Sequence, residues 1–150
     1  MEQFLAELVF PGVASSVTVA RHCVGRVLKC AGHQDVDNVL IVVSELVGNA
    51  VLHTDSRLSG GLVTVDVSAL DESTARITVI DQGSVTVPRL REFSDTACAG
   101  RGLSIVEQLS AFWGVREDAL GGRAVWAEVH TTKDTLPEDA MSVPAGVAEA

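Results

Sequence analysis

Three polar side chains recur at intervals of four residues in an otherwise apolar stretch. The run SELVGNAVLHT, residues 44–54, places Glu45, Asn49 and His53 among valines and leucines. At about 100° per residue they follow one line along a helix, beside its apolar stripe. A carboxylate and an amide buried there without partners would cost roughly 2 kcal/mol or more each. The line therefore requires partners, which are either neighbouring backbone and arginine groups or a ligand.

Two further motifs could complete a binding site. In the run VIDQG, Asp81 lies in register with Ile77 and Val79, so this strand ends in a carboxylate on its core-facing side. The run GRGLS, residues 100–104, follows a long polar segment and precedes a helix, where backbone N–H groups favour an anion. No Lys-Ser or Lys-Thr follows these glycines, which excludes a P-loop. Taken singly, a strand-ending turn and a helix-entry turn explain the two motifs equally well.

The elements that position these motifs follow from apolar periodicity. Ser15 or Ser16 can cap the first helix and Gly32 can end it. The order of elements predicts an α+β fold, a two-layer sandwich whose mixed, mostly antiparallel sheet has helices on one face. In chain order we expect a strand at 3–10, helices at 17–32 and from Asp35 or Asp37 to about 54, strands at 62–70 and 75–81, a helix at 101–114, and strands at 114–118 and 123–130.

Composition narrows the class of protein. The chain has 150 residues, 47 % of them hydrophobic and 4 % aromatic, which fits one domain with an aliphatic core. Its formal charge of −9 argues against nucleic-acid binding. The absence of an apolar run of membrane length or a signal peptide, together with three cysteines lacking C-x-x-C spacing, predicts a cytoplasmic protein with reduced thiols. Residues 1–130 form the expected domain, and 131–150 a disordered acidic tail.

In their order and spacing, the motifs resemble the Bergerat-fold (GHKL) ATPase superfamily, and most of all its anti-sigma branch of switch-protein serine kinases. The resemblance covers Phe4 to about His130 and rests on the runs SELVGNAVLHT, VIDQG, GRGLSIVEQLSAFWGV and GGRAVWAEV. It implies a histidine-kinase-like ATP-binding domain. It also implies that Asn49 binds a Mg²⁺ ion that bridges the ATP phosphates, that Glu45 is the general base, and that His53 supports the helix end or the phosphates.

The resemblance assigns the other motifs to the base and the phosphates. Asp81 would accept the exocyclic amino group of adenine, and Gly83 would let the base come close. The backbone N–H groups of residues 100–103, which are Gly100, Arg101, Gly102 and Leu103, would hold the phosphates. Residues 84–99 would form a lid that closes over the triphosphate.

One position departs from the family pattern. Near the start of the last strand the family usually has a threonine that helps to bind adenine, and this chain has Ala124 there. The loss of one hydrogen bond, roughly 0.5–1.5 kcal/mol, predicts weaker ATP binding without abolishing it.

The resemblance implies an ATP- and Mg²⁺-dependent anti-sigma regulator that phosphorylates a serine of an anti-anti-sigma (antagonist) protein and controls a sigma factor by partner switching. It also implies a homodimer. The alternative is a non-catalytic, ATP-sensing module for protein binding, and the presence of Glu45 favours the kinase. An interaction domain that has lost nucleotide binding is disfavoured, because Asn49, Asp81, Gly83 and Gly102 are all present.

Overall fold

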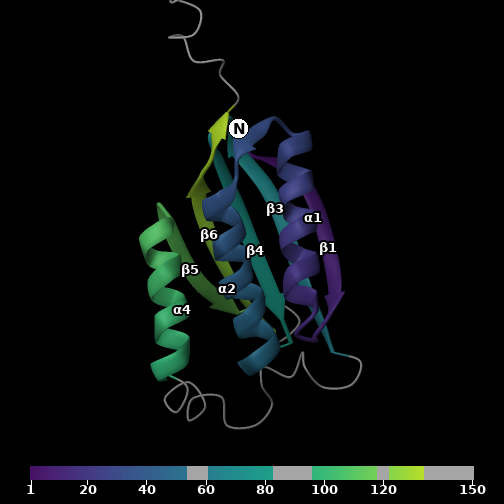
Figure 1. Ribbon diagram of the computed structural model, residues 1–150, viewed down its shortest axis with the longest axis vertical. Coiled ribbons are helices and arrows are strands. Elements are labelled where there is room, and N and C mark those ends of the chain that lie inside the picture. Colours follow the sequence, from purple (N-terminus) through teal and green to yellow (C-terminus); the bar gives the residue numbers. More distant parts are fainter. Residues whose placement is uncertain (54–60, 83–95, 118–121, 134–150) are drawn as a thin grey trace, which may run out of the picture.

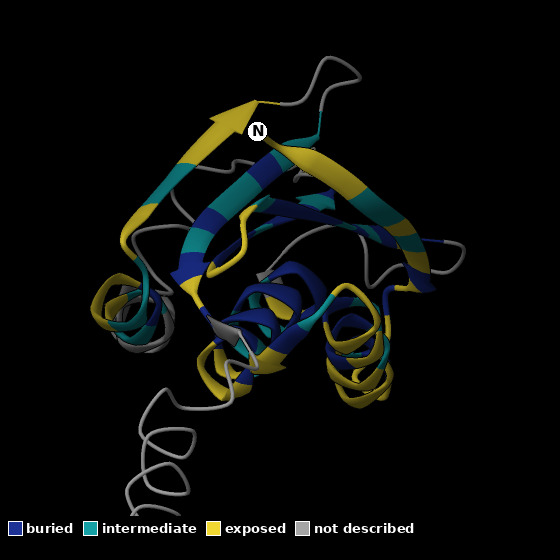
Figure 2. Cartoon of the chain, turned by 90° about the horizontal axis from the view of Figure 1, so that it is seen from above, coloured by how far each residue is buried: buried dark blue, intermediate teal, exposed yellow. Residues whose placement is uncertain are grey.

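An antiparallel sheet and three helices on one of its faces make up the described part of the chain (Figures 1 and 2). This computed structural model describes residues 1–53, 61–82, 96–117 and 122–133. The main elements are β1 (Gln3–Pro11), α1 (Ser16–Cys30), α2 (Asp37–His53), β3 (Leu62–Asp71), β4 (Thr74–Asp81), α4 (Thr96–Leu109), β5 (Phe112–Glu117) and β6 (Arg123–His130), with a small sheet of β2 (His33–Asp35) and β7 (Thr132–Lys133).

The five strands of the main sheet lie in the order β1-β3-β4-β6-β5, and every neighbouring pair is antiparallel. One row of directly paired residues crosses all five strands, and each member is aliphatic: Leu8, Val65, Val79, Val125 and Val115. Residues opposite each other in antiparallel strands share a face, so this row belongs to the side that the helices cover. The α+β class with helices on one face is confirmed, and the five described strands of the main sheet are all antiparallel instead of mixed.

The core lies between this face and the helices, as the dark blue layer of Figure 2 shows. Alternation predicted the inward side of β3 correctly, since Val63, Val65 and Val67 are completely buried. Helix α2 lies between α1 and α4 and packs on β4 and β6. Within the described residues, no helix is long and apolar enough to cross a membrane.

The ends of the first two helices partly match their predicted signals. Ser15 makes no side-chain capping bond, and the Ser16 hydroxyl donates instead to the Pro11 carbonyl at 2.6 Å, so neither serine caps α1. Gly32 follows the end of α1 with a φ of 98°, a conformation that favours glycine. Helix α2 begins at Asp37, whose N–H donates to the Asp35 carboxylate.

The helix predicted at 101–114 was wrong at both ends. Helix α4 begins at Thr96 and ends at Leu109, and β5 begins at Phe112. The aromatic pair at Phe112 and Trp113 has a strand preference, and the Ala111 N–H already donates to the Glu128 carbonyl at the edge of β6. Strand pairing with β6 therefore ends the helical segment earlier than periodicity indicated.

The small sheet of β2 and β7 was not predicted. Its buried contact joins the His33 ring to the Thr131 hydroxyl, and both side chains are buried. Three polar residues in β2 carry no apolar alternation, so the sequence gives no strand signal there. The described fold thus continues to Lys133, three residues past the predicted domain end, while residues 134–150 of the predicted tail lie outside the described ranges.

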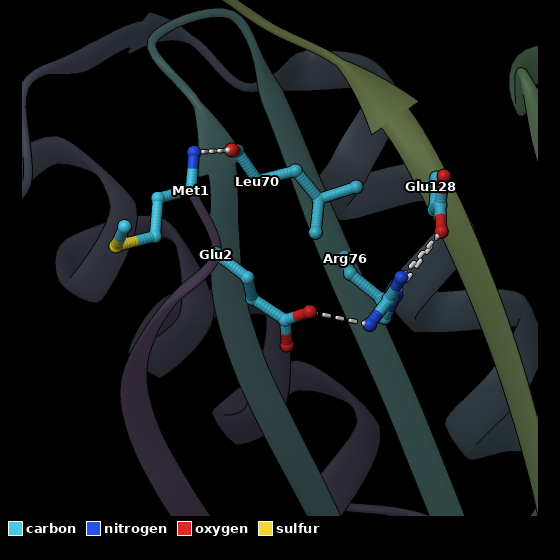
Figure 3. Close-up of polar contacts among 5 residues, drawn as sticks. All are labelled: Met1, Glu2, Leu70, Arg76 and Glu128. Atoms are coloured by element: carbon cyan, nitrogen blue, oxygen red, sulfur yellow. Dashed lines mark hydrogen bonds and ion pairs between the residues drawn. The ribbon is translucent and has the colours of Figure 1, made fainter.

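On the sheet face away from the helices, Arg76 of β4 contacts Glu2, which precedes β1, and Glu128 of β6 (Figure 3). Its Nη1 donates to Glu2 at 2.8 Å, and its Nη2 and Nε donate to Glu128 Oε2 at 2.7 and 3.1 Å. The hydrogen bonds to Glu128 and the charge of Glu2 raise the pKa of Arg76. This guanidinium ties the chain's beginning to β4 and β6.

Candidate functional site

Four elements meet at one end of the molecule, the lower end in Figure 1. Helix α2 and strand β4 end there, and strand β6 and helix α4 begin there. Asp81, the last residue of β4, pairs directly with Arg123, the first residue of β6. The predicted site residues of α2, β4 and α4 therefore belong to elements that share this end, although they come from three separate parts of the sequence.

On α2, Glu45 and Asn49 are half-buried. Not all of the apolar residues of this helix are buried: Ile41 is 41 % exposed and Leu52 is 60 % exposed. These two side chains and Glu45 lie within about 40° of one another around the helix axis. The polar line therefore borders a narrow exposed strip, which lowers the cost of burying Glu45 and Asn49. The side chain of His53, the last residue of α2, lies outside the described set.

The side of α2 that carries Asn49 follows from its spacing to Leu40. Leu40 lies against Gly25 of α1, where an added Cβ would be 3.5 Å from its side chain. Nine residues turn a helix by about 900°, which is half a turn beyond two complete turns. Asn49 therefore points away from α1, and α4 lies on that side of α2 (Figure 2).

Asp81 supplies a buried carboxylate at this end of the sheet. It continues the helix-facing side formed by Ile77 and Val79, as its register predicted, and its side chain is 2 % exposed. Burial of a carboxylate is costly unless it is paired. The Nε atom of Arg123 lies 3.8 Å from Asp81 Oδ2, and this arginine side chain is 31 % exposed. Arg123 thus offsets the Asp81 charge from the more open side of the pair.

Gly122 brings the start of β6 against the end of β4. A Cβ added at Gly122 would lie 2.1 Å from the Asp81 carbonyl oxygen. Only glycine allows this approach of two backbones. Sequence reasoning missed the contact, although the Gly-Gly pair before the last strand was a usable signal.

The strand register corrects the interpretation of Ala124. Ala124 pairs with Ile80, so its methyl group lies on the opposite face of the sheet from Asp81. A hydroxyl there would not reach the Asp81 side, and the predicted loss of one adenine hydrogen bond at Ala124 does not follow. The residue of β6 that pairs directly with Asp81, on the same face of the sheet, is Arg123.

The Gly-x-Gly segment lies inside α4. Because α4 begins at Thr96, the residues with N–H groups free of helical partners are 96–99, and Gly100, Arg101, Gly102 and Leu103 come after them. The predicted start of this helix was therefore five residues too late, and the first helical turn comes from the predicted lid. Gly83 and residues 84–95 of that lid lie outside the described ranges, so their roles stay predictions.

The donor set limits what metal the site could hold. Among the described residues, no group of three His, Cys, Asp or Glu side chains is placed to bind a metal ion. Asn49 offers one amide oxygen, with the Glu45 carboxylate one turn earlier. This set suits Mg²⁺, which commonly takes one or two protein oxygens and completes its shell with phosphates and water.

Residues 10–129 match the family described as histidine kinase-like ATPase domain. This chain is also similar to a solved structure, the crystal structure of full-length ShkA in complex with AMPPNP, with 31 % sequence identity and a TM-score of 0.46. The match covers 67 % of this chain and 23 % of the ShkA chain. This chain thus spans less than a quarter of ShkA. No curated protein matches it.

Proposed function

Because the chain belongs to the histidine kinase-like ATPase domain family, we propose that it binds ATP with Mg²⁺ at the end where α2 and β4 terminate. The observation that carries this proposal is Asp81, a buried carboxylate that ends β4 on the helix-covered face. An ionised carboxylate accepts hydrogen bonds and donates none, so it suits the exocyclic amino group of adenine.

We further propose that the protein transfers the γ-phosphoryl group to a serine of an antagonist protein, and so controls a sigma factor by partner switching. Phosphoryl transfer depends mainly on positioning and on charge stabilisation, which a small site can supply. When bound, Mg²⁺ neutralises charge on the phosphates. Asn49 would hold the ion through its amide oxygen, and Glu45, one turn earlier and half-buried, would accept the proton of the serine hydroxyl.

One observation favours a second function, an ATP-sensing module without turnover. The N–H groups of Gly100 and Gly102 lie within α4, where they have helical carbonyl partners. Holding the phosphates through these groups would require the first turn of α4 to rearrange. Such a rearrangement could report nucleotide binding to a protein partner without any phosphoryl transfer. The homodimer, the protein partners and the cytoplasmic location stay predictions.

Glu45→Gln separates the two functions. Labelled ATP is incubated with the protein and with candidate antagonist proteins from the same cell, and ATP affinity is measured in parallel. If the protein is a kinase, we expect Glu45→Gln to keep its ATP affinity and its rate of phosphoryl transfer to fall by about 10²–10⁴-fold. Transfer at the wild-type rate would remove Glu45 from the mechanism. ATP binding without transfer to any candidate by the wild type would favour the sensing module.

A further inference from the structure

We propose that Arg123 reads the purine base together with Asp81, and that this pair lets the site accept guanine as well as adenine nucleotides. The inference rests on the proposed nucleotide site, and it adds to that site a residue and a ligand class. The inference starts from the strand register. Arg123 pairs directly with Asp81, so a guanidinium lies beside this carboxylate, where from the sequence we expected the place of a missing threonine hydroxyl.

Arg123 and the Asp81 carboxylate lie next to each other on the same side of the sheet. The two residues are direct partners across β4 and β6, and the Nε to Oδ2 distance is 3.8 Å. Asp81 is the inner member, with a side chain 2 % exposed, and Arg123 is the outer one, at 31 %. A base that binds the Asp81 carboxylate would therefore lie beside a guanidinium whose Nε atom is 3.8 Å from it.

The contact at Gly122 holds this pair in place. The β4–β6 register runs without a shift from Thr74–His130 to Asp81–Arg123, and at its end the backbone of Gly122 lies directly against the Asp81 carbonyl. A shift of one residue would move Arg123 to the other face of the sheet. The cation is thus a fixed part of the surface around Asp81.

A carboxylate by itself distinguishes the two purines. It accepts the exocyclic amino group of adenine, but it repels the O6 carbonyl oxygen that guanine has at the same position. A neighbouring guanidinium changes this balance, because it donates hydrogen bonds and carries a positive charge.

Beside adenine, Arg123 can donate to a ring nitrogen next to the amino group. Beside guanine, the carboxylate can accept from the N1 and N2 donors while Arg123 donates to O6, an acceptor that arginine commonly binds. The Asp81 carboxylate as acceptor and the adjacent Arg123 guanidinium as donor can therefore bind either base, provided that the base shifts its position relative to the two side chains.

The test is the ratio of the dissociation constants of GTP and ATP, each measured by calorimetry with Mg²⁺. The variants are Arg123→Met, which keeps much of the side-chain length without the donors, and Arg76→Met as the matched control. Arg76 lies on the opposite face of the sheet, where it pairs with Glu2 and Glu128. Circular dichroism and a urea titration check that both variants fold.

We expect the wild type to bind GTP within about tenfold of ATP, and Arg123→Met to weaken GTP at least about tenfold more than ATP. Arg76→Met should leave the ratio unchanged. A wild type that prefers ATP by more than about 100-fold, or an Arg123→Met variant that weakens both nucleotides equally, overturns the inference and leaves the ATP site standing. Binding of neither nucleotide to the wild type overturns the proposed function as well.

Discussion

The close contact between Gly122 and Asp81 makes a strong prediction for Gly122→Ala. The new Cβ would lie 2.1 Å from the Asp81 carbonyl oxygen, whereas real Cβ atoms essentially never approach another atom within 3.0 Å. The two backbones must therefore separate by about 0.9 Å or more. The oxygen belongs to the backbone and the position of a Cβ is fixed by its own backbone, so no rotamer change can relieve the clash.

Overpacking of this kind costs about 1–3 kcal/mol of unfolding free energy. The separation also displaces Asp81, and a free-energy loss of 1.4 kcal/mol in binding corresponds to about tenfold in affinity. We therefore expect Gly122→Ala to lower the free energy of unfolding by about 1–3 kcal/mol and to weaken ATP binding about tenfold or more.

Urea titration followed by tryptophan fluorescence measures the stability, since Trp113 and Trp126 lie in the neighbouring strands β5 and β6. Gly48→Ala is the matched control: a Cβ there meets nothing within 4 Å, and the residue is inside α2. The free energy of unfolding of Gly48→Ala should rise by about 0.5–1 kcal/mol, because alanine has a higher helix propensity than glycine. An unchanged urea midpoint and unchanged ATP affinity in Gly122→Ala would mean that the two backbones do not lie this close.

Three further predictions concern the scaffold. Ile77→Ala should cost about 2–5 kcal/mol of unfolding free energy in a urea titration, because it leaves a cavity at a completely buried position; a loss below 1 kcal/mol would contradict the described core. A double-mutant cycle of Arg76→Gln and Glu128→Gln should give a coupling of about 0.2–1 kcal/mol that falls with added salt, as for other partly exposed ion pairs. The Ser73 backbone N–H lowers the pKa of Asp71 from its ordinary value of 3.8, so the folded state loses stability as the pH falls below that value. Asp71→Asn should remove this part of the acid dependence, and an unfolding midpoint with the same dependence on pH in both proteins would exclude it.

Local patterns were enough to predict most elements and the placement of Asp81. The alternation of valines in β3 and of Ile77 and Val79 in β4 specifies which side of each strand is buried, and Asp81 continues that side. The polar spacing of Glu45 and Asn49 likewise depends on one helix alone. These predictions required no knowledge of how distant segments pair.

The sequence-based predictions were wrong where the structure depends on pairing between segments that are far apart in the sequence. Whether Ala124 or Arg123 shares a face with Asp81 depends on the register of β6 against β4, which neither strand specifies by itself. The end of α4 depends on the pairing of β5 with β6, and the small sheet joins His33 to a strand about 100 residues later. The contact of Gly122 with Asp81 is of the same kind, because it exists only after the two strands are side by side.

We propose above that Asp81 and Asn49 belong to one ATP–Mg²⁺ site at the end of β4 and α2. Calorimetric titration of the wild type, Asp81→Asn and Asn49→Ala with ATP and Mg²⁺ tests it most directly. We expect the wild type to bind ATP and each substitution to weaken binding about tenfold or more, a loss of about 1.4 kcal/mol. Asp81→Asn removes the charge from the hydrogen bond to adenine, and Asn49→Ala removes the oxygen that would bind Mg²⁺. Unchanged ATP affinity in both variants would contradict it.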